Sequence, residues 1–204
     1  MPLPNFGHLQ AQPDLLRTWL QSNLLISVNP NNHGLGARWM TIVPFVHPIF
    51  GAATAQDTQG HAMDVYEVTT AGANAGNGLR AFICNYVPGT VQQETIGALG
   101  DYCFTAAMNG CTFGIGPAVG GQRTVAHANH GGNSVQQRVQ LTGVLGPLTG
   151  LKVLEPSAYR RVKPNSRLTA TTFGIRTGMN WNFYFQSYES IGNAVYCSYG
   201  VMPV

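Results

Sequence analysis

The chain has 204 residues, the length of a single domain, and it is long enough to bury a sizeable hydrophobic core. Only 9% of its residues are charged, against about 25% in an average globular protein. This composition excludes a charge-rich disordered chain and disfavours a long helix or coiled coil. The net charge of +3 rests on 11 lysines and arginines, too few to predict a surface that follows nucleic-acid phosphates. Residues 1–204 are therefore expected to form one domain that binds no nucleic acid.

Membrane association is not expected either, because no apolar run approaches the ~18 residues of a membrane-spanning helix. The opening residues, MPLPNFGHLQAQPDLL, lack the basic residues and the apolar stretch of a secretory signal. A protein with this start that leaves its cell is expected to use a non-classical export route. The four cysteines form no C-x-x-C pair and are expected to be free, mostly buried thiols. They are Cys84, Cys103, Cys111 and Cys197.

The first predicted element is a short amphipathic helix over residues 13–22, which Asp14 can cap and in which Trp19 shares a stripe with three leucines. Strands follow, because apolar and β-branched residues cluster between small, polar turns. Segments 51–61 and 71–78 consist mainly of small and polar residues and are predicted to be loops. The predicted strands of this half of the chain are 24–28, 39–45, 63–69 and 79–86.

Residues 101–109 predict a short helix, since Asp101 is a good N-cap and Gly110 suits the position after a helix end. The later predicted strands are 111–116, 122–127, 135–144, 168–175, 181–186 and 194–201. About eight to ten strands with two helices are typical of an α+β, mainly β fold. We expect an antiparallel two-sheet sandwich with a few short helices.

The sequence GPAVGGQ joins two of these strands and predicts a β-hairpin. If Gly116 closes the loop against Gln122, the loop comprises residues 117–121. The same register sets Cys111 directly opposite His127, and directly opposed residues have Cβ atoms about 4.5–5.5 Å apart on one side of a sheet. A register shift of one residue would separate the two side chains, whereas a shift of two would leave them diagonal on the same face.

A thiol and an imidazole at this spacing form the pair found in cysteine-dependent nucleophilic catalysis. An imidazolium beside the thiol lowers the thiol pKa from its usual value near 8.5 and supplies the reactive thiolate. The Asn109-Gly110 pair leaves the backbone N–H of Cys111 free to stabilise an oxyanion. On spacing alone, a pair of inert neighbours in a core is the more common explanation.

Other interpretations of these residues compete with catalysis. His127-x-x-His130 with a cysteine suggests a zinc site, although residues three apart in a strand point to opposite faces, and His130 fits a glycine turn at the rim of the site. His33 is a turn residue or a substrate contact. A papain-like protease is disfavoured, because that family separates its cysteine and histidine by about 130 residues or more. A non-catalytic binding module for carbohydrate or protein, or a capsid-like jelly roll, would make Cys111 and His127 inert.

Thr105, Cys111 and His127 follow one another at spacings of six and sixteen residues. This order resembles the bacterial glutamine deamidases with a shared β-sandwich, which include the catalytic domain of cytotoxic necrotizing factor, the Burkholderia lethal factor and the chemoreceptor deamidase CheD. Asn109 stands where that family usually has a serine. Residues 174–188 also resemble a Gly-x-x-Thr-Gly strand pair near the end of the lethal factor. The matching residues are Phe104, Thr105, Asn109, Gly110, Cys111, Gly120, Gly121, Val125 and His127.

The resemblance implies a cysteine-dependent enzyme that converts a glutamine side chain of a protein to glutamate through a thioester, without a cofactor. If an amine replaces water, the same site performs transglutamination. Carried over by position, Cys111 is the nucleophile, His127 the general base and acid, and Thr105 the third site residue, which can orient His127 or only bond a backbone carbonyl. The residues expected beside the substrate are Asn109, Gly110 and His130.

The resemblance also sets the expected biology, a monomeric bacterial toxin or effector that acts in a host cytosol. Rho-type GTPases, a translation-initiation helicase and chemoreceptors serve as substrates of relatives. Nothing in this chain selects among these substrates, and residues 1–80 match none of the family.

Overall fold

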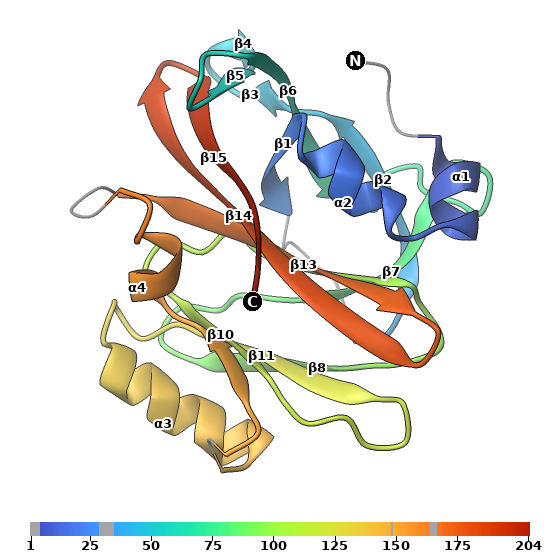
Figure 1. The fold of residues 1–204 in the computed structure, drawn as a ribbon, viewed down its shortest axis with the longest axis vertical. Coiled ribbons are helices and arrows are strands. Elements are labelled where there is room, and N and C mark those ends of the chain that lie inside the picture. The colour runs from blue at the N-terminus through green and yellow to red at the C-terminus, as the bar shows by residue number, and fades with distance from the viewer. Residues whose placement is uncertain (1–4, 29–34, 148, 164–166) are drawn as a thin grey trace.

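The computed structural model describes residues 5–28, 35–147, 149–163 and 167–204 (Figure 1). Its largest element is a nine-stranded sheet in the order β1-β6-β2-β7-β9-β13-β14-β15-β5, and β5 also pairs with β6. The strands are β1 (Asn23–Val28), β2 (Arg38–Pro44), β5 (Thr54–Asp57), β6 (Ala62–Thr69), β7 (Leu79–Cys84), β9 (Tyr102–Thr105), β13 (Thr169–Thr177), β14 (Asn180–Gly192) and β15 (Val195–Pro203).

The pairing of β5 with β6 closes eight strands of this sheet into a barrel. The protein is mostly β, with 48% of residues in strands and 15% in helices, but the expected two-sheet sandwich is wrong. Closure depends on the parallel pairs β7–β9 and β15–β5, and β1 adds to the outside of this ring as a parallel partner of β6. Parallel neighbours need long crossover connections, so alternation and turn signals, which predict hairpins, do not reveal them.

A second sheet of four strands has the order β12-β10-β11-β8. Its strands are β8 (Val91–Ile96), β10 (Thr112–Ile115), β11 (Arg123–Ala128) and β12 (Lys152–Leu154), and a separate pair is formed by β3 (Val46–His47) and β4 (Gly51–Ala52). The helices are α1 (Phe6–Ala11), α2 (Leu15–Leu20), α3 (Ser134–Leu145) and α4 (Pro156–Tyr159). None of the described helices has the length and hydrophobicity of a membrane-spanning segment.

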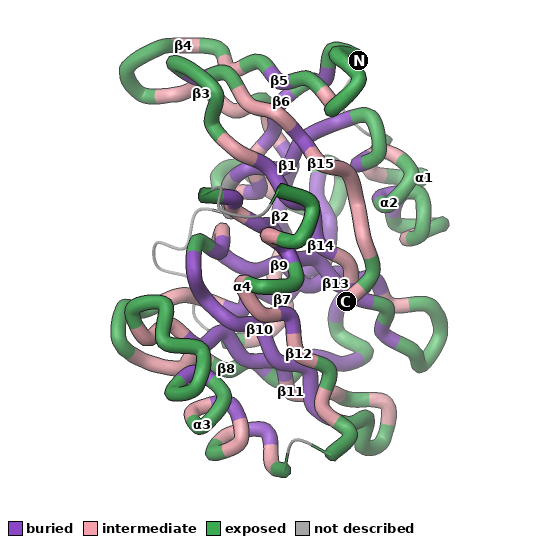
Figure 2. Tube along the Cα trace, turned by 60° about the vertical axis from the view of Figure 1, so that its left-hand side comes forward, coloured by how far each residue is buried: buried purple, intermediate pink, exposed green. Residues whose placement is uncertain are grey.

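The four-stranded sheet packs on the barrel through one face and on α3 through the other. A hydrophobic core between the two sheets joins Phe82 of β7 and Phe183 of β14 to Phe113 of β10. On the outer face, Gly114 leaves the space that α3 needs, since a Cβ there would lie 2.7 Å from Leu145 Cδ1. Figure 2 shows the strands buried in the middle of the molecule and an exposed surface on α3.

Two predicted elements are wrong in type. Residues 101–109 contain the strand β9 instead of a helix, because its side chains are buried on both faces, with Tyr102 in one core and Cys103 in the other. Residues 135–144 belong to the helix α3 instead of a strand. The side chain of Asn133 caps this helix by accepting a hydrogen bond from the Gln136 backbone at 3.1 Å. The predicted loop 51–61 also contains β4 and β5.

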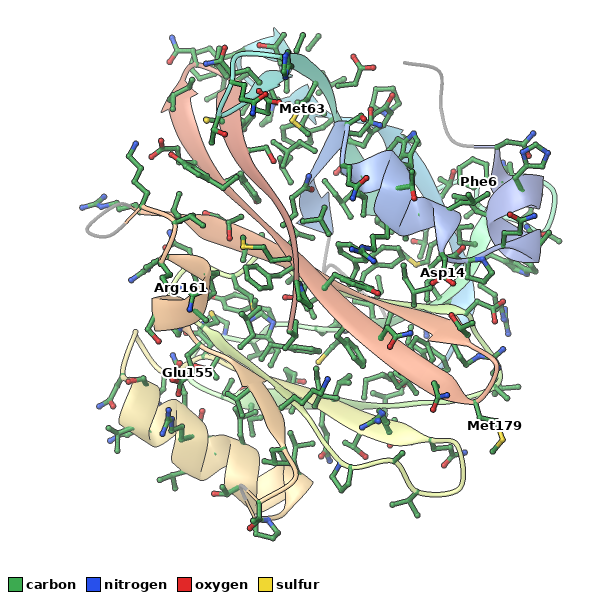
Figure 3. The ribbon with its side chains drawn as sticks, in the orientation of Figure 1. Phe6, Asp14, Met63, Glu155, Arg161 and Met179 are labelled. Carbon is green, nitrogen blue, oxygen red and sulfur yellow. The ribbon has the colours of Figure 1, made fainter. Side chains whose placement is uncertain are left out.

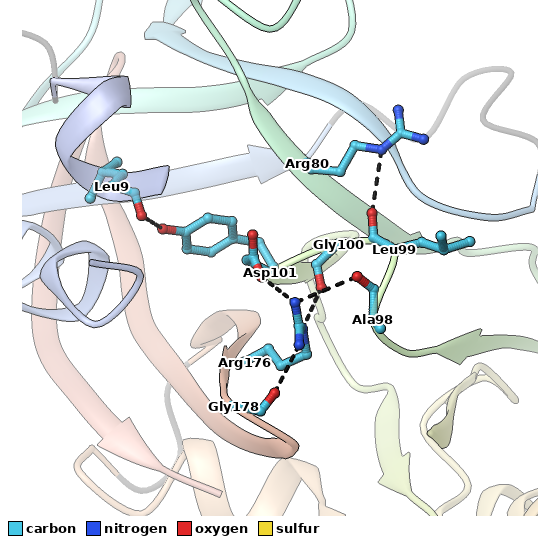
Figure 4. A network of polar contacts seen from close by, with 9 residues as sticks. Leu9, Arg80, Ala98, Leu99, Gly100, Asp101, Arg176 and Gly178 are labelled. Atoms are coloured by element: carbon cyan, nitrogen blue, oxygen red, sulfur yellow. Dashed lines mark hydrogen bonds and ion pairs between the residues drawn. The ribbon is translucent and has the colours of Figure 1, made fainter. Parts of the chain in front are cut away.

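Asp101, expected to cap a helix, instead forms an ion pair with Arg176 of β13 at 2.6 Å (Figure 4). The same guanidinium donates to the carbonyl oxygens of Gly100 at 3.0 Å and Gly178 at 2.8 Å. The Tyr102 hydroxyl next along the chain donates to the carbonyl of Leu9 at 2.7 Å and so attaches α1 to the barrel. These contacts fix the start of β9, the strand that leads into the Cys111 segment.

Candidate active site

The hairpin that carries Cys111 and His127 turns more tightly than expected. Val119 and Gln122 form a bridge around Gly120-Gly121, whose φ angles of 57° and 79° are the positive values that a type I′ turn requires. The expected five-residue loop is therefore wrong, and the register moves by two residues. His127 lies opposite Phe113 instead of Cys111.

The shift of two residues leaves both side chains on one face of the sheet. Ala126 and Ala128 of β11 pack with α3, so His127 between them points to the core between the sheets. Cys111 belongs to that inter-sheet core. If the register is extended by one residue from Thr112, Cys111 and His127 are diagonal neighbours on adjacent strands. The Cα atoms of such neighbours lie about 7–8 Å apart.

Two buried side chains that sequence analysis did not select hold the backbone around Cys111. Tyr159 of α4 accepts a hydrogen bond from the Gly110 N–H at 2.7 Å and donates one to the Cys111 carbonyl at 3.3 Å. Gln137 of α3 donates to the Gly110 carbonyl at 2.8 Å and accepts from the Thr112 hydroxyl. The local sequence carries no signal for either contact, because both partners come from separate helices.

Asn109 and Gly110 lie where several loops meet. Gly110 has a φ of +93°, which favours glycine, and a Cβ there would lie 3.8 Å from Gly132 Cα and 3.7 Å from an Arg160 nitrogen. Arg160 also donates to the exposed side chain of Asn109 at 3.3 Å. The structure thus brings together Asn109, Gly110 and the turn after His130. The His130 side chain is half-buried.

The thiol and the imidazole are both buried, with 4% of Cys111 and 1% of His127 exposed. Burial raises the pKa of the Cys111 thiol to about 11, although a backbone hydrogen bond from Asn109 lowers it. Burial also lowers the pKa of His127 to about 4. At neutral pH both groups are therefore uncharged, and the expected pairing of a thiolate with an imidazolium is absent from the resting structure.

His127 is held through its backbone pairing and by ring packing. Neither ring nitrogen has a hydrogen-bond partner among the described residues, so the imidazole does not bond the Cys111 thiol. Its ring lies 5.6 Å from that of Tyr86, centre to centre. A buried neutral imidazole without a partner is unusual, because each unsatisfied polar group disfavours folding by about 1–3 kcal/mol.

Thr105 ends β9, and its hydroxyl donates to the Thr172 carbonyl at 3.5 Å and accepts from the Thr172 N–H at 3.3 Å. The hydroxyl therefore bonds the neighbouring strand rather than His127. The described residues contain no group of three or more His, Cys, Asp and Glu side chains that could hold a metal ion. His33 lies outside the described residues.

No family model matches the chain, and no curated protein matches it in sequence. Among solved structures, the C-terminal domain of CNFy from Yersinia pseudotuberculosis is similar, with a TM-score of 0.40 and 12% identity, over 98% of this chain and 96% of that chain. A likeness this weak supports no inference about function, which must rest on the chemistry of this chain's own residues.

Proposed function

We propose that this protein is a cysteine-dependent amidase that deamidates a glutamine side chain of another protein, with Cys111 and His127 as the reacting pair. The observation that carries the proposal is the unpaired imidazole of His127, on the core face that Cys111 shares. A catalytic role is one explanation for a buried polar group that the fold leaves without a partner. The order of Thr105, Cys111 and His127, which resembles the bacterial glutamine deamidases, supports the same reaction.

With a neutral resting pair, we propose general-base catalysis, which needs no preformed thiolate. His127 accepts the thiol proton while the Cys111 sulfur attacks the carboxamide carbon, because a thiol with a pKa near 11 forms little free thiolate at neutral pH. The Gly110 N–H already donates to Tyr159, so the Cys111 N–H is the donor proposed for the oxyanion. His127 then protonates the departing ammonia, which leaves a thioester.

Water completes the reaction. His127 removes a proton from water as the water oxygen attacks the thioester carbon, and the Cys111 sulfur leaves and takes up that proton. The products are ammonia and a glutamate side chain, so the substrate gains one negative charge. An amine in place of water would form a cross-link by the same steps.

Substrate entry requires an opening, since both reacting groups are almost fully buried. We propose that the segments 85–90 and 129–133, which flank His127, move apart when a substrate loop binds. Asn109, exposed beside this region, and His130, half-buried at its rim, are the proposed substrate contacts. Thr105 is proposed to support the site through its bonds to β13.

The resemblance to deamidase toxins supports a proposal for the setting. The protein would act as a monomer in a host cytosol after export by a non-classical route. Its substrate would be a host protein such as a Rho-type GTPase or a translation-initiation helicase.

Mass spectrometry of host-lysate proteins after incubation with the enzyme tests this function. We expect one glutamine of one protein to become glutamate with the wild type and with Cys197→Ser, and to stay unchanged with Cys111→Ser and His127→Ala. Cys197 is the matched control because its free thiol is more exposed than that of Cys111. Conversion that persists in Cys111→Ser would contradict the proposal. So would the absence of conversion together with equally slow iodoacetamide labelling of all four thiols, the result expected of a non-catalytic binding module.

A further inference from the structure

The segment 152–167 is rich in positive charge. It contains five of the 11 basic residues and one acid, Glu155. The basic residues are Lys152, Arg160, Arg161, Lys163 and Arg167. In a chain with so few charges, this clustering on and around α4 is a local feature that the overall net charge conceals.

Part of this charge is already neutralised. Glu155 pairs with Arg138 of α3, and Lys163 pairs with Glu189 of β14. In the part of the chain that the structure describes, no carboxylate lies within ion-pair distance of Lys152, Arg160 or Arg161. Lys152 and Arg161 are exposed and therefore remain available to a partner with negative charge, whereas the Arg160 guanidinium also bonds Asn109.

A cavity of about 330 Å³ lies beside one of these cations, Arg161. Arg161 forms part of its wall, just after the end of α4 in Figure 3. The rest of the wall is mainly apolar and comes from four elements, with Leu154 of β12, Ala158 of α4, Phe185 of β14 and Met202 of β15. An apolar cavity with one guanidinium at its wall suits an apolar side chain next to an acidic group.

The same segment touches the candidate active site. Arg160 donates to Asn109, and Tyr159 holds the backbone of Gly110 and Cys111. Arg161, which lines the cavity, follows directly in the chain. A protein segment seated against α4 would therefore extend toward the entrance to Cys111.

We propose that this α4 surface, made of Lys152, Arg160, Arg161 and the cavity beside them, docks an acidic segment of the substrate protein that carries an apolar side chain. The role of the surface in substrate selection rests on the proposed deamidation, whereas binding itself does not. Several unpaired cations spread over the segment fit a peptide with several acids better than a small molecule with one carboxylate. Complementary charge of this kind speeds encounter and excludes wrong partners.

Fluorescence polarisation with a labelled hexapeptide, Leu-Phe flanked on each side by two acidic residues, tests this surface on the full chain. We expect the wild type and Cys111→Ser to bind it equally, and a peptide with amides in place of the acids to bind weakly. Arg161→Gln should weaken binding by about tenfold, the effect of one charge-assisted contact. Ala158→Trp, which fills the cavity from an exposed position, should also weaken it. Arg17→Gln on α2 should not.

The proposal is overturned if neither peptide binds, if the amide peptide binds as well as the acidic one, or if Arg161→Gln and Ala158→Trp both leave binding unchanged. Raising the salt concentration should weaken binding to the wild type, and salt-independent binding would also contradict a charged docking surface. Peptide binding does not depend on catalysis, because Cys111→Ser keeps the binding surface. If the protein bound the peptide but deamidated nothing, the proposed function would fail and the docking surface would stand. If it deamidated a substrate but did not bind the peptide, only the docking surface would fail.

Discussion

The two sides of the proposed site differ in how their polar groups are satisfied. Around Cys111, Tyr159 and Gln137 form hydrogen bonds with three consecutive residues. Across the hairpin, no described residue forms a hydrogen bond with either nitrogen of the His127 ring. Both regions are buried to a similar degree, so burial alone does not explain the difference.

The Cys111 segment and the His127 imidazole therefore have different roles. The Cys111 segment is held in one conformation by contacts that also stabilise the fold. The imidazole contributes a polar group that the fold leaves unpaired, which keeps both nitrogens available to a thiol and a substrate. Substitutions on the two sides should therefore have opposite effects on stability.

The largest stability loss is expected from Gln137→Leu. This change leaves the Gly110 carbonyl and the Thr112 hydroxyl without partners, and two buried unsatisfied groups should lower the free energy of unfolding by about 2–5 kcal/mol. Urea denaturation measures the effect. The matched control is Gln136→Leu on the exposed face of the same helix, which should change stability by about 0.5 kcal/mol or less. Equal effects of the two substitutions would show that the Gln137 contacts contribute nothing.

Lowering the pH should destabilise the protein through His127, on the other side of the site. The pKa of His127 is lowered to about 4 in the folded protein, against about 6.5 when unfolded. The unfolded chain therefore binds the proton first, and stability falls as the pH drops from about 6.5 to about 4, by about 3 kcal/mol. Above pH 6.5 this group has no effect. Denaturation curves between pH 4 and 7 should lose this component in His127→Leu, and an unchanged pH dependence would contradict the assignment.

Tyr159→Phe removes only the hydroxyl that bridges Gly110 and Cys111. We expect a loss of about 1–3 kcal/mol in the free energy of unfolding, from the Gly110 N–H left without an acceptor. Thermal and urea unfolding measure it, with Tyr184→Phe, a half-buried tyrosine of β14, as control. A loss no larger than in the control would mean that water replaces the hydroxyl.

The smallest effect on stability is expected from His127→Leu at pH 7.5, although this substitution should abolish activity. Replacing an unpaired imidazole by an apolar side chain of similar size should leave stability unchanged or raise it by about 1 kcal/mol. Deamidation, followed by mass spectrometry, should be lost. A destabilisation as large as that of Gln137→Leu would show that the imidazole supports the fold.

The errors in predicting this site have specific causes. The sequence pattern correctly located strands β10 and β11 and the glycines between them, but the turn uses Gly120-Gly121 alone, and that shorter turn moves His127 from Cys111 to Phe113. Residues 135–144 read as a strand because their polar and apolar residues show no clear helical stripe. The helix forms because Asn133 caps its N-terminus and because Gln137 and Leu141, four residues apart, are buried on one face.

The sequence by itself determined the mostly β composition, the positions of most strands and the hairpin that brings Cys111 and His127 to one face, because alternation and turn residues act over a few neighbouring positions. Only the tertiary structure decided that β5 closes a barrel, that Tyr159 and Gln137 hold Cys111, and that both reacting groups are buried. Each of these depends on segments far apart in the chain, whose pairing is set by packing and hydrogen bonding in three dimensions and leaves no periodic mark in the sequence.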